Sequence, residues 1–185
     1  MVYIVEGDFS SDRQSKYDFT ASTINHLLET GKSNINVTFF EFDDKGNMVG
    51  FDSPKASSTS RSDLVMSYNG TLYKIELKER KGKYVSDYYG KEGDSEGWML
   101  NIEKKNELLK DNNFIPLFVN LYPDDKIRIW NLNKIEGYDE IHKDISKYTV
   151  AVSEKMPQER LGVWNKDSKI IDRVKGCPSN GKWSN

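Results

Sequence analysis

The chain has 185 residues, of which 30% are charged and 36% hydrophobic, and its formal net charge is −2. This composition is typical of a globular protein of one domain and argues against a strongly basic nucleic-acid-binding protein. No apolar run approaches the roughly 18–20 residues of a membrane span, and no secretory signal is recognisable at the N-terminus. The single cysteine, Cys177, excludes an intramolecular disulfide and a cysteine-based zinc site, so we expect a cytoplasmic protein.

The first third of the chain is expected to contain a strand, a helix and a second strand. Residues 1–14 are predicted to form a short strand and a polar loop. Apolar residues at helical spacing predict an amphipathic helix over 17–30, ended by Gly31. Residues 36–42 have the pattern of a strand. Residues 43–61 are rich in Asp, Gly, Ser, Thr and Pro and are predicted to be a loop.

The middle of the chain predicts a β-hairpin, a helix and two further strands. The hairpin spans 62–78 and is followed by a polar, glycine-containing segment at 81–97, which is either a substrate clamp or a solvent-exposed connection. A helix is predicted over 98–110. Residues 114–122 are almost wholly apolar, as in a central buried strand, and 126–132 form the next strand.

This order of elements predicts an α/β fold with a mixed central sheet flanked by helices. We expect one domain over residues 1–150, and a C-terminal extension over 151–185 that packs on the core or extends it. Strands are expected at 148–152 and 168–174.

The hairpin brings three charged residues together. The Asn69-Gly70 dipeptide strongly favours a two-residue turn, and paired residue numbers then sum to 139. Asp63 consequently lies opposite Glu76, with Cβ atoms about 4.5–5.5 Å apart. The alternation of a strand puts Lys78 on the same face as Glu76.

Two facing carboxylates destabilise a sheet unless something neutralises them. A divalent cation is a suitable partner, and Mg²⁺ prefers hard oxygen ligands such as Asp63, Glu76 and the carbonyl oxygen of Leu77. Lys78 is then placed to orient a water molecule or to stabilise charge on a phosphate. These groups together suffice for phosphodiester hydrolysis.

A simpler interpretation is that Asp63 and Glu76 belong to a charged ladder on the surface, balanced by Lys74, Lys78 and Arg61. The apolar setting of Glu76, between Ile75 and Leu77, favours a site, because acids rarely enter half-buried strands without a partner. The basic cluster over 78–83 likewise fits either a solvated strand end or a surface for nucleic-acid phosphates.

The residues Asp63, Glu76, Leu77 and Lys78 resemble the motif of the PD-(D/E)xK nuclease superfamily. The expected order of helix, three strands, helix and strand over roughly 17–132 also resembles the restriction-endonuclease-like core of that superfamily, αβββαβ. Within it, the pattern is most similar to the archaeal and phage Holliday junction resolvase branch, in which an arginine commonly precedes the aspartate, as Arg61 does here.

The resemblance implies a Mg²⁺-dependent DNA endonuclease, with Mn²⁺ as a substitute, that acts in DNA repair or recombination in a phage or bacterium. It implies that Asp63, Glu76 and Lys78 are catalytic, and that a polar residue of the helix after Glu-x-Lys assists them. Asn101 is the first choice for that residue, and Lys104 and Lys105 are the alternatives. The expected DNA-binding residues are Arg61, Arg80, Lys81, Lys83, Lys104 and Lys105.

The chain departs from the family pattern in its first helix, where the resemblance implies an acidic residue. Glu29 lies late in that helix and Asp18 at its start, and a capping or surface acid is the favoured interpretation of each. A homodimer is an oligomeric state that the resemblance allows. An alternative function is a non-catalytic nucleic-acid-binding or protein-binding module that keeps the nuclease scaffold.

Overall fold

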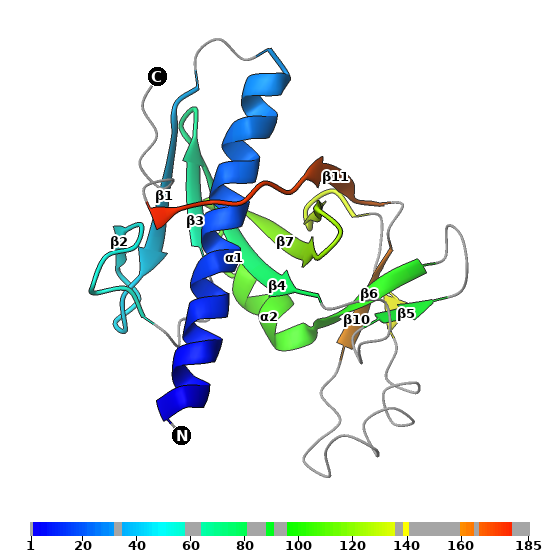
Figure 1. The fold of residues 1–185 in the computed structure, drawn as a ribbon. Coiled ribbons are helices and arrows are strands. Elements are labelled where there is room, and N and C mark those ends of the chain that lie inside the picture. The colour runs from blue at the N-terminus through cyan, green and yellow to red at the C-terminus, as the bar shows by residue number, and fades with distance from the viewer. Residues whose placement is uncertain are drawn as a thin grey trace.

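The computed structural model contains two β-sheets and two helices (Figure 1). It describes residues 2–31, 35–57, 64–80, 88–90, 96–135, 139–140, 160–164 and 167–178. Side chains are described for 13–31, 35–57, 64–80, 100, 102–135 and 167–178. Within the described residues, no helix has the length and apolarity needed to cross a membrane.

The described elements follow one another along the chain as helices α1 and α2 and strands β1 to β11. Their bounds are α1 Val2–Glu29, β1 Val37–Phe42, β2 Met48–Gly50, β3 Leu64–Tyr68, β4 Thr71–Glu79, β5 Tyr88–Gly90, β6 Glu96–Asn101, α2 Ile102–Leu109, β7 Phe114–Tyr122, β8 Lys126–Asn131, β9 Asp139–Glu140, β10 Arg160–Trp164 and β11 Lys169–Asp172.

The larger sheet has seven strands in the order β11-β8-β7-β4-β3-β1-β2, and the smaller sheet has four in the order β5-β6-β10-β9. The central pair β4 and β7 is parallel, whereas the other paired strands of both sheets are antiparallel. The predicted α/β fold with a mixed central sheet is therefore confirmed, and α1, β1, β3, β4, α2 and β7 follow the predicted αβββαβ order.

The hairpin has the predicted turn and register. Asn69 and Gly70 have φ angles of 50° and 82°, the left-handed conformation that a tight two-residue turn requires. Leu64 pairs with Ile75, and every described pair of β3 and β4 sums to 139. The described part of β3 begins at Leu64, so Asp63 lies outside the described residues.

The expectation for residues 1–14 was wrong, because α1 starts at Val2 and runs without interruption to Glu29. The β-branched residues near its start suggested a strand, but each residue added to an existing helix gains a hydrogen bond. The end of the helix is as predicted. Gly31 follows it with a φ of 76°, and its amide donates to the carbonyl oxygen of Leu28.

Other predicted segments also differ from the structure, and the polar segment predicted over 81–97 contains β5 and the start of β6. The loop predicted over 43–61 contains β2, since the Asp43 carboxylate accepts hydrogen bonds from the amides of Lys45 and Asn47 and turns the chain back along β1. The second helix begins at Ile102 instead of residue 98, because 96–101 pair with β10. Pairing with a distant strand has overridden the local helical pattern. Residues 148–152, predicted to be a strand, lie outside the described residues.

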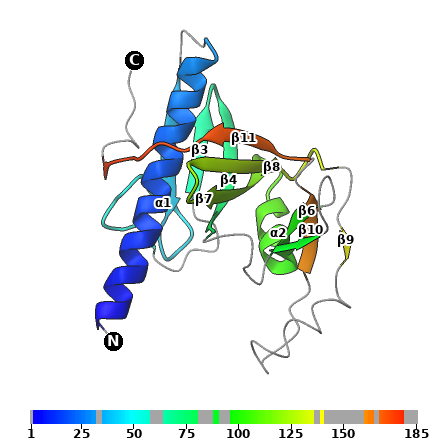
Figure 2. The same cartoon turned by 45° about the vertical axis from the view of Figure 1, so that its right-hand side comes forward.

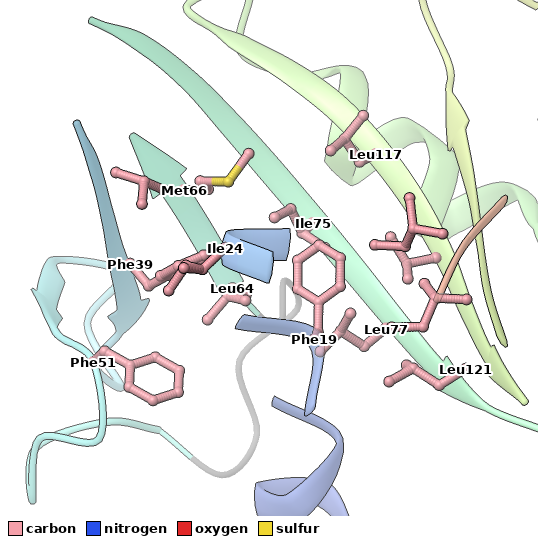
Figure 3. Packing of buried hydrophobic residues seen from close by; sticks show 14 of the residues in the cluster. Phe19, Ile24, Phe39, Phe51, Leu64, Met66, Ile75, Leu77, Leu117 and Leu121 are labelled. Carbon is pink, nitrogen blue, oxygen red and sulfur yellow. The ribbon is translucent and has the colours of Figure 1, made fainter. Parts of the chain in front are cut away.

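The larger sheet buries a separate core on each face. Figure 2 shows α1 and α2 on opposite sides of its strands. The larger core lies under α1 and includes Phe19, Ile75 and Leu77 (Figure 3). The smaller core lies under α2 and includes Leu108, Phe118 and Trp130. We call these two sides of the sheet the α1 face and the α2 face.

The C-terminal segment adds β11 to the edge of the larger sheet, beside β8. The chain then crosses α1 (Figure 1), where the amide of Val174 donates to Ser22 Oγ and the amide of Gly176 donates to Asp18 Oδ1. Residues distant in sequence are thereby tied to the first helix.

Candidate functional site

Glu76 lies on the α2 face, where β4 runs past its described partner β3. The last described pair of the hairpin is Leu64 with Ile75, and β4 continues to Glu79 beside β7 alone among the described strands. The alternation of the strand sends Ile75 and Leu77 into the core under α1 and Glu76 to the opposite face. The Glu76 side chain is only 3% exposed.

Two ammonium groups lie beside the buried carboxylate. Glu76 Oε1 is 3.7 Å from Lys78 Nζ and 3.5 Å from Lys104 Nζ. The side chains of Lys78 and Lys104 are 44% and 34% exposed, so both amines reach solvent while the carboxylate does not. Their positive charge offsets part of the desolvation cost of Glu76.

Lys104 is the α2 side chain that reaches Glu76. The sequence pattern favoured Asn101 and kept Lys104 and Lys105 as alternatives. Asn101 ends β6 opposite Arg160, and its side chain lies outside the described ones. A signal for Lys104 was present, since it precedes the buried Leu108 by four residues and so shares its inward face of the helix.

A second polar row crosses the α2 face next to Glu76. In the registers of β4, β7 and β8, Lys78 is opposite Asn120 and Asn120 is opposite Arg128. The neighbouring row consists of Glu76, Phe118 and Trp130, and the rings of Phe118 and Trp130 stack with centroids 5.3 Å apart.

Asn120 is held by two neighbours in the polar row. Its Oδ1 accepts a hydrogen bond of 2.9 Å from Nε of the buried Arg80, and its Nδ2 donates to the Tyr122 hydroxyl oxygen at 3.2 Å. Burial raises the pKa of Tyr122, and the hydrogen bond from Asn120 and the charges of Arg128 and Arg80 partly oppose this rise. Sequence reasoning missed Asn120, Tyr122 and Arg128, although Asn120 is the one polar residue within an otherwise apolar strand.

The proposed first-helix acids have other positions. Asp18 is buried on the α1 face, where its Oδ2 accepts from Arg173 Nη2 at 2.8 Å and from Arg173 Nε at 3.1 Å. Arg173 also bonds to Glu79, which alternates with Lys78 and so points to the face opposite Glu76. Glu29 is exposed on the last helical turn and accepts from Asn25 Nδ2.

The remaining predicted site residues are only partly within the described chain. Arg61, Asp63, Lys81 and Lys83 lie outside the described residues. Arg80 and Lys105 are described, Arg80 as a buried side chain and Lys105 as a half-buried one.

Within the described residues, no three His, Cys, Asp or Glu side chains lie close enough to hold a metal ion. The donors present are nevertheless of the right chemistry for Mg²⁺. A buried carboxylate and a neighbouring backbone carbonyl are hard oxygen ligands, and Mg²⁺ needs only one or two protein carboxylates when water and phosphate complete its coordination.

Comparison with known proteins gives little further information. No protein-family model matches the chain, and no curated protein matches it. Among solved structures, the chain is similar to Hjc, a Holliday junction resolvase from the archaeal hyperthermophile Archaeoglobus fulgidus. The TM-score is 0.37 and the identity 13%, over 77% of this chain and 87% of that chain.

Proposed function

We propose that this protein is a metal-dependent nuclease that hydrolyses phosphodiester bonds in DNA. The observation that supports the proposal is the Glu76 carboxylate, buried at the end of the hairpin with the amines of Lys78 and Lys104 beside it. Burial of a charged acid in a strand is costly, and here the cost falls at the Glu-x-Lys position that the family resemblance marks as catalytic.

Glu76 and Asp63 are the proposed carboxylate ligands of Mg²⁺, with the Leu77 carbonyl as a further oxygen. Asp63 is included because of the hairpin register. The described pairs of β3 and β4 sum to 139, and the next pair in that series would be Asp63 with Glu76. Bound Mg²⁺ would supply a water molecule of lowered pKa and neutralise phosphate charge. Lys78 would orient that water.

Lys104 has a separate role in the proposal. Its amine lies on the side of Glu76 that α2 covers, and it is placed to stabilise negative charge on the phosphate oxygens as the bond to phosphorus breaks. The family resemblance suggests branched DNA from repair or recombination as the substrate. It also suggests that the protein acts as a homodimer.

A cleavage panel tests the proposal. Linear duplex, single-stranded and four-way DNA are incubated with the protein and Mg²⁺ or Mn²⁺, with and without a chelator. We expect cleavage that needs the metal, and a loss of at least about 100-fold in Glu76→Gln and in Lys78→Ala. Glu103→Gln, an exposed acid on α2, is the matched control and should keep full activity. Full activity of Glu76→Gln would exclude the mechanism.

The position of Asp18 favours a second candidate, a binding module without catalysis. Arg173 holds this acid on the face opposite Glu76, so α1 contributes it to the structure instead of to the site. Calorimetric titration with Mg²⁺ separates the two functions. A nuclease should bind the ion through Glu76 and lose affinity in Glu76→Gln, whereas a binding module should bind DNA equally well without the ion.

A further inference from the structure

The polar row beside Glu76 has the composition of an anion-binding surface. Four cationic side chains lie on the α2 face around it: Lys78, Arg80, Lys104 and Arg128. The chain as a whole has a net charge of −2, so this concentration of positive charge is local. Lys78 and Lys104 are partly exposed, whereas Arg80 is buried and bonded to Asn120.

We propose that Lys78 and Arg128 form a subsite for a second phosphate of the DNA backbone, next to the phosphate that is cleaved at Glu76, and that the fully buried Asn120 between them is a positioning residue. This inference rests on the proposed function, because Glu76 marks the reacting phosphate. It extends that function by requiring a substrate that continues past the cleaved bond across β7 and β8.

The spacing of the two rows supports the subsite. Residues two apart on one face of a strand are about 6.6 Å apart, so the polar row runs parallel to the Glu76 row at about that distance. Neighbouring strands are about 4.8 Å apart, which places the Cα of Arg128 about 10 Å from that of Lys78. A nucleic-acid strand that starts at Glu76 and runs obliquely across β7 and β8 therefore passes from the Glu76 row to the polar row.

The hydrogen bonds within the row support a phosphate ligand. Asn120 Nδ2 donates to the Tyr122 hydroxyl oxygen, and the charge of Arg128 acts against the rise that burial causes in the pKa of Tyr122. Arg128 Nη1 donates to Ser168 Oγ at 2.7 Å, and this bond orients its guanidinium. Arginine offers a planar fork of donors that matches phosphate oxygens.

Contacts of this kind position the backbone without reading its sequence. We therefore expect the subsite to affect affinity equally for DNA of different sequence, and to raise the dependence of binding on salt. Each phosphate contact contributes about one unit to the slope of log K against log salt concentration.

The test is DNA binding without turnover, measured by fluorescence anisotropy across a range of salt concentrations. Every protein carries Glu76→Gln, and the panel adds Arg128→Gln, Arg128→Lys or Lys169→Gln. Lys169 is the matched control, an exposed cation on the α1 face opposite Ile129 of β8. We expect the salt slope to fall by about one unit in Arg128→Gln, and to stay unchanged in Arg128→Lys and Lys169→Gln.

An unchanged slope in folded Arg128→Gln, or an equal fall in Lys169→Gln, would overturn the subsite. If Arg128→Gln does not fold, a scan of neutral methylphosphonate groups along the DNA replaces it. A methylphosphonate at one position of the DNA should weaken binding more in the protein with Arg128 than in Arg128→Lys. If the two proteins respond equally at every position, the subsite is overturned. Because none of these measurements needs cleavage, failure of the nuclease assay is read separately.

Discussion

Glu41 and Glu76 lie in the same sheet but have different surroundings. Both are almost inaccessible to solvent, with whole-residue exposures of 1% and 2%. Glu41, on the α1 face, accepts hydrogen bonds from the Arg13 guanidinium, from Lys16 Nζ at 2.9 Å and from the amide of Asp52 at 2.7 Å. Glu76, on the α2 face, lies 3.5 Å from Lys104 Nζ and 3.7 Å from Lys78 Nζ, and both of these lysine side chains are partly exposed.

The same contrast holds for the other charges of the two faces. On the α1 face, Arg173 joins Asp18, Glu79 and the carbonyl of Tyr122, and thereby links α1, β4, β7 and the C-terminal segment. On the α2 face, the partly exposed amines of Lys78 and Lys104 lie beside one buried acid. Buried hydrogen-bonded networks stabilise a fold, whereas amines that reach solvent remain accessible to a ligand.

The largest expected effect compares Glu41→Gln with Glu76→Gln. The first leaves Lys16 buried without its carboxylate and leaves Arg13 paired with Asp52 alone, and it should lower the free energy of unfolding by about 3 kcal/mol. The second leaves two partly exposed amines that stay hydrated, so we expect a loss of less than about 1 kcal/mol. Urea unfolding of both variants measures the difference, and equal losses would remove the distinction between the faces.

A smaller effect is expected from Arg173→Ala. The arginine is 13% exposed, but its partner Glu79 is 34% exposed, so we expect about 2 kcal/mol, below the cost at a fully buried pair. Lys126→Ala removes the nearby exposed ion pair with Asp172 and serves as the control, with an unfolding midpoint close to that of the unmodified protein. A loss as small as that of the control would show that the network does not hold the C-terminal segment.

Local patterns predicted those parts of the molecule whose determinants lie close together in the sequence. The Asn69-Gly70 turn gave the register of β3 and β4, since a two-residue turn leaves one pairing that buries Leu64 and Ile75 together. The apolar run of β7 was likewise recognisable from its composition.

Features that depend on distant pairing could not be read from the sequence. The polar row needs the parallel register of β4 with β7, which pairs Lys78 with Asn120 across a long crossover. The start of α2 depends on β6 pairing with β10, from a distant part of the chain. Glu41 looked like an ordinary strand residue, because nothing local indicates that Arg13 and Lys16 cover it.

The smallest expected effect concerns two tyrosines that report the charge of each face. Burial raises the pKa of Tyr17, and the hydrogen bond to Asp52 and the charge of that carboxylate raise it further. Burial also raises the pKa of Tyr122, but there the cations Arg128 and Arg80 act against the rise. In both cases the neutral form is favoured in the folded protein. Each tyrosine thus contributes stability that is complete below the ordinary pKa of 10.0 and is lost as the pH rises through the folded value.

Nuclear magnetic resonance of isotope-labelled tyrosine, assigned with Tyr17→Phe and Tyr122→Phe, follows both titrations. Bound DNA should neutralise the cations of the α2 face and raise the pKa of Tyr122 further, while the pKa of Tyr17 stays where it was. A shift of both by the same amount would mean that DNA does not select the α2 face, because the sheet separates the two hydroxyl groups and only a ligand bound on one side can distinguish them.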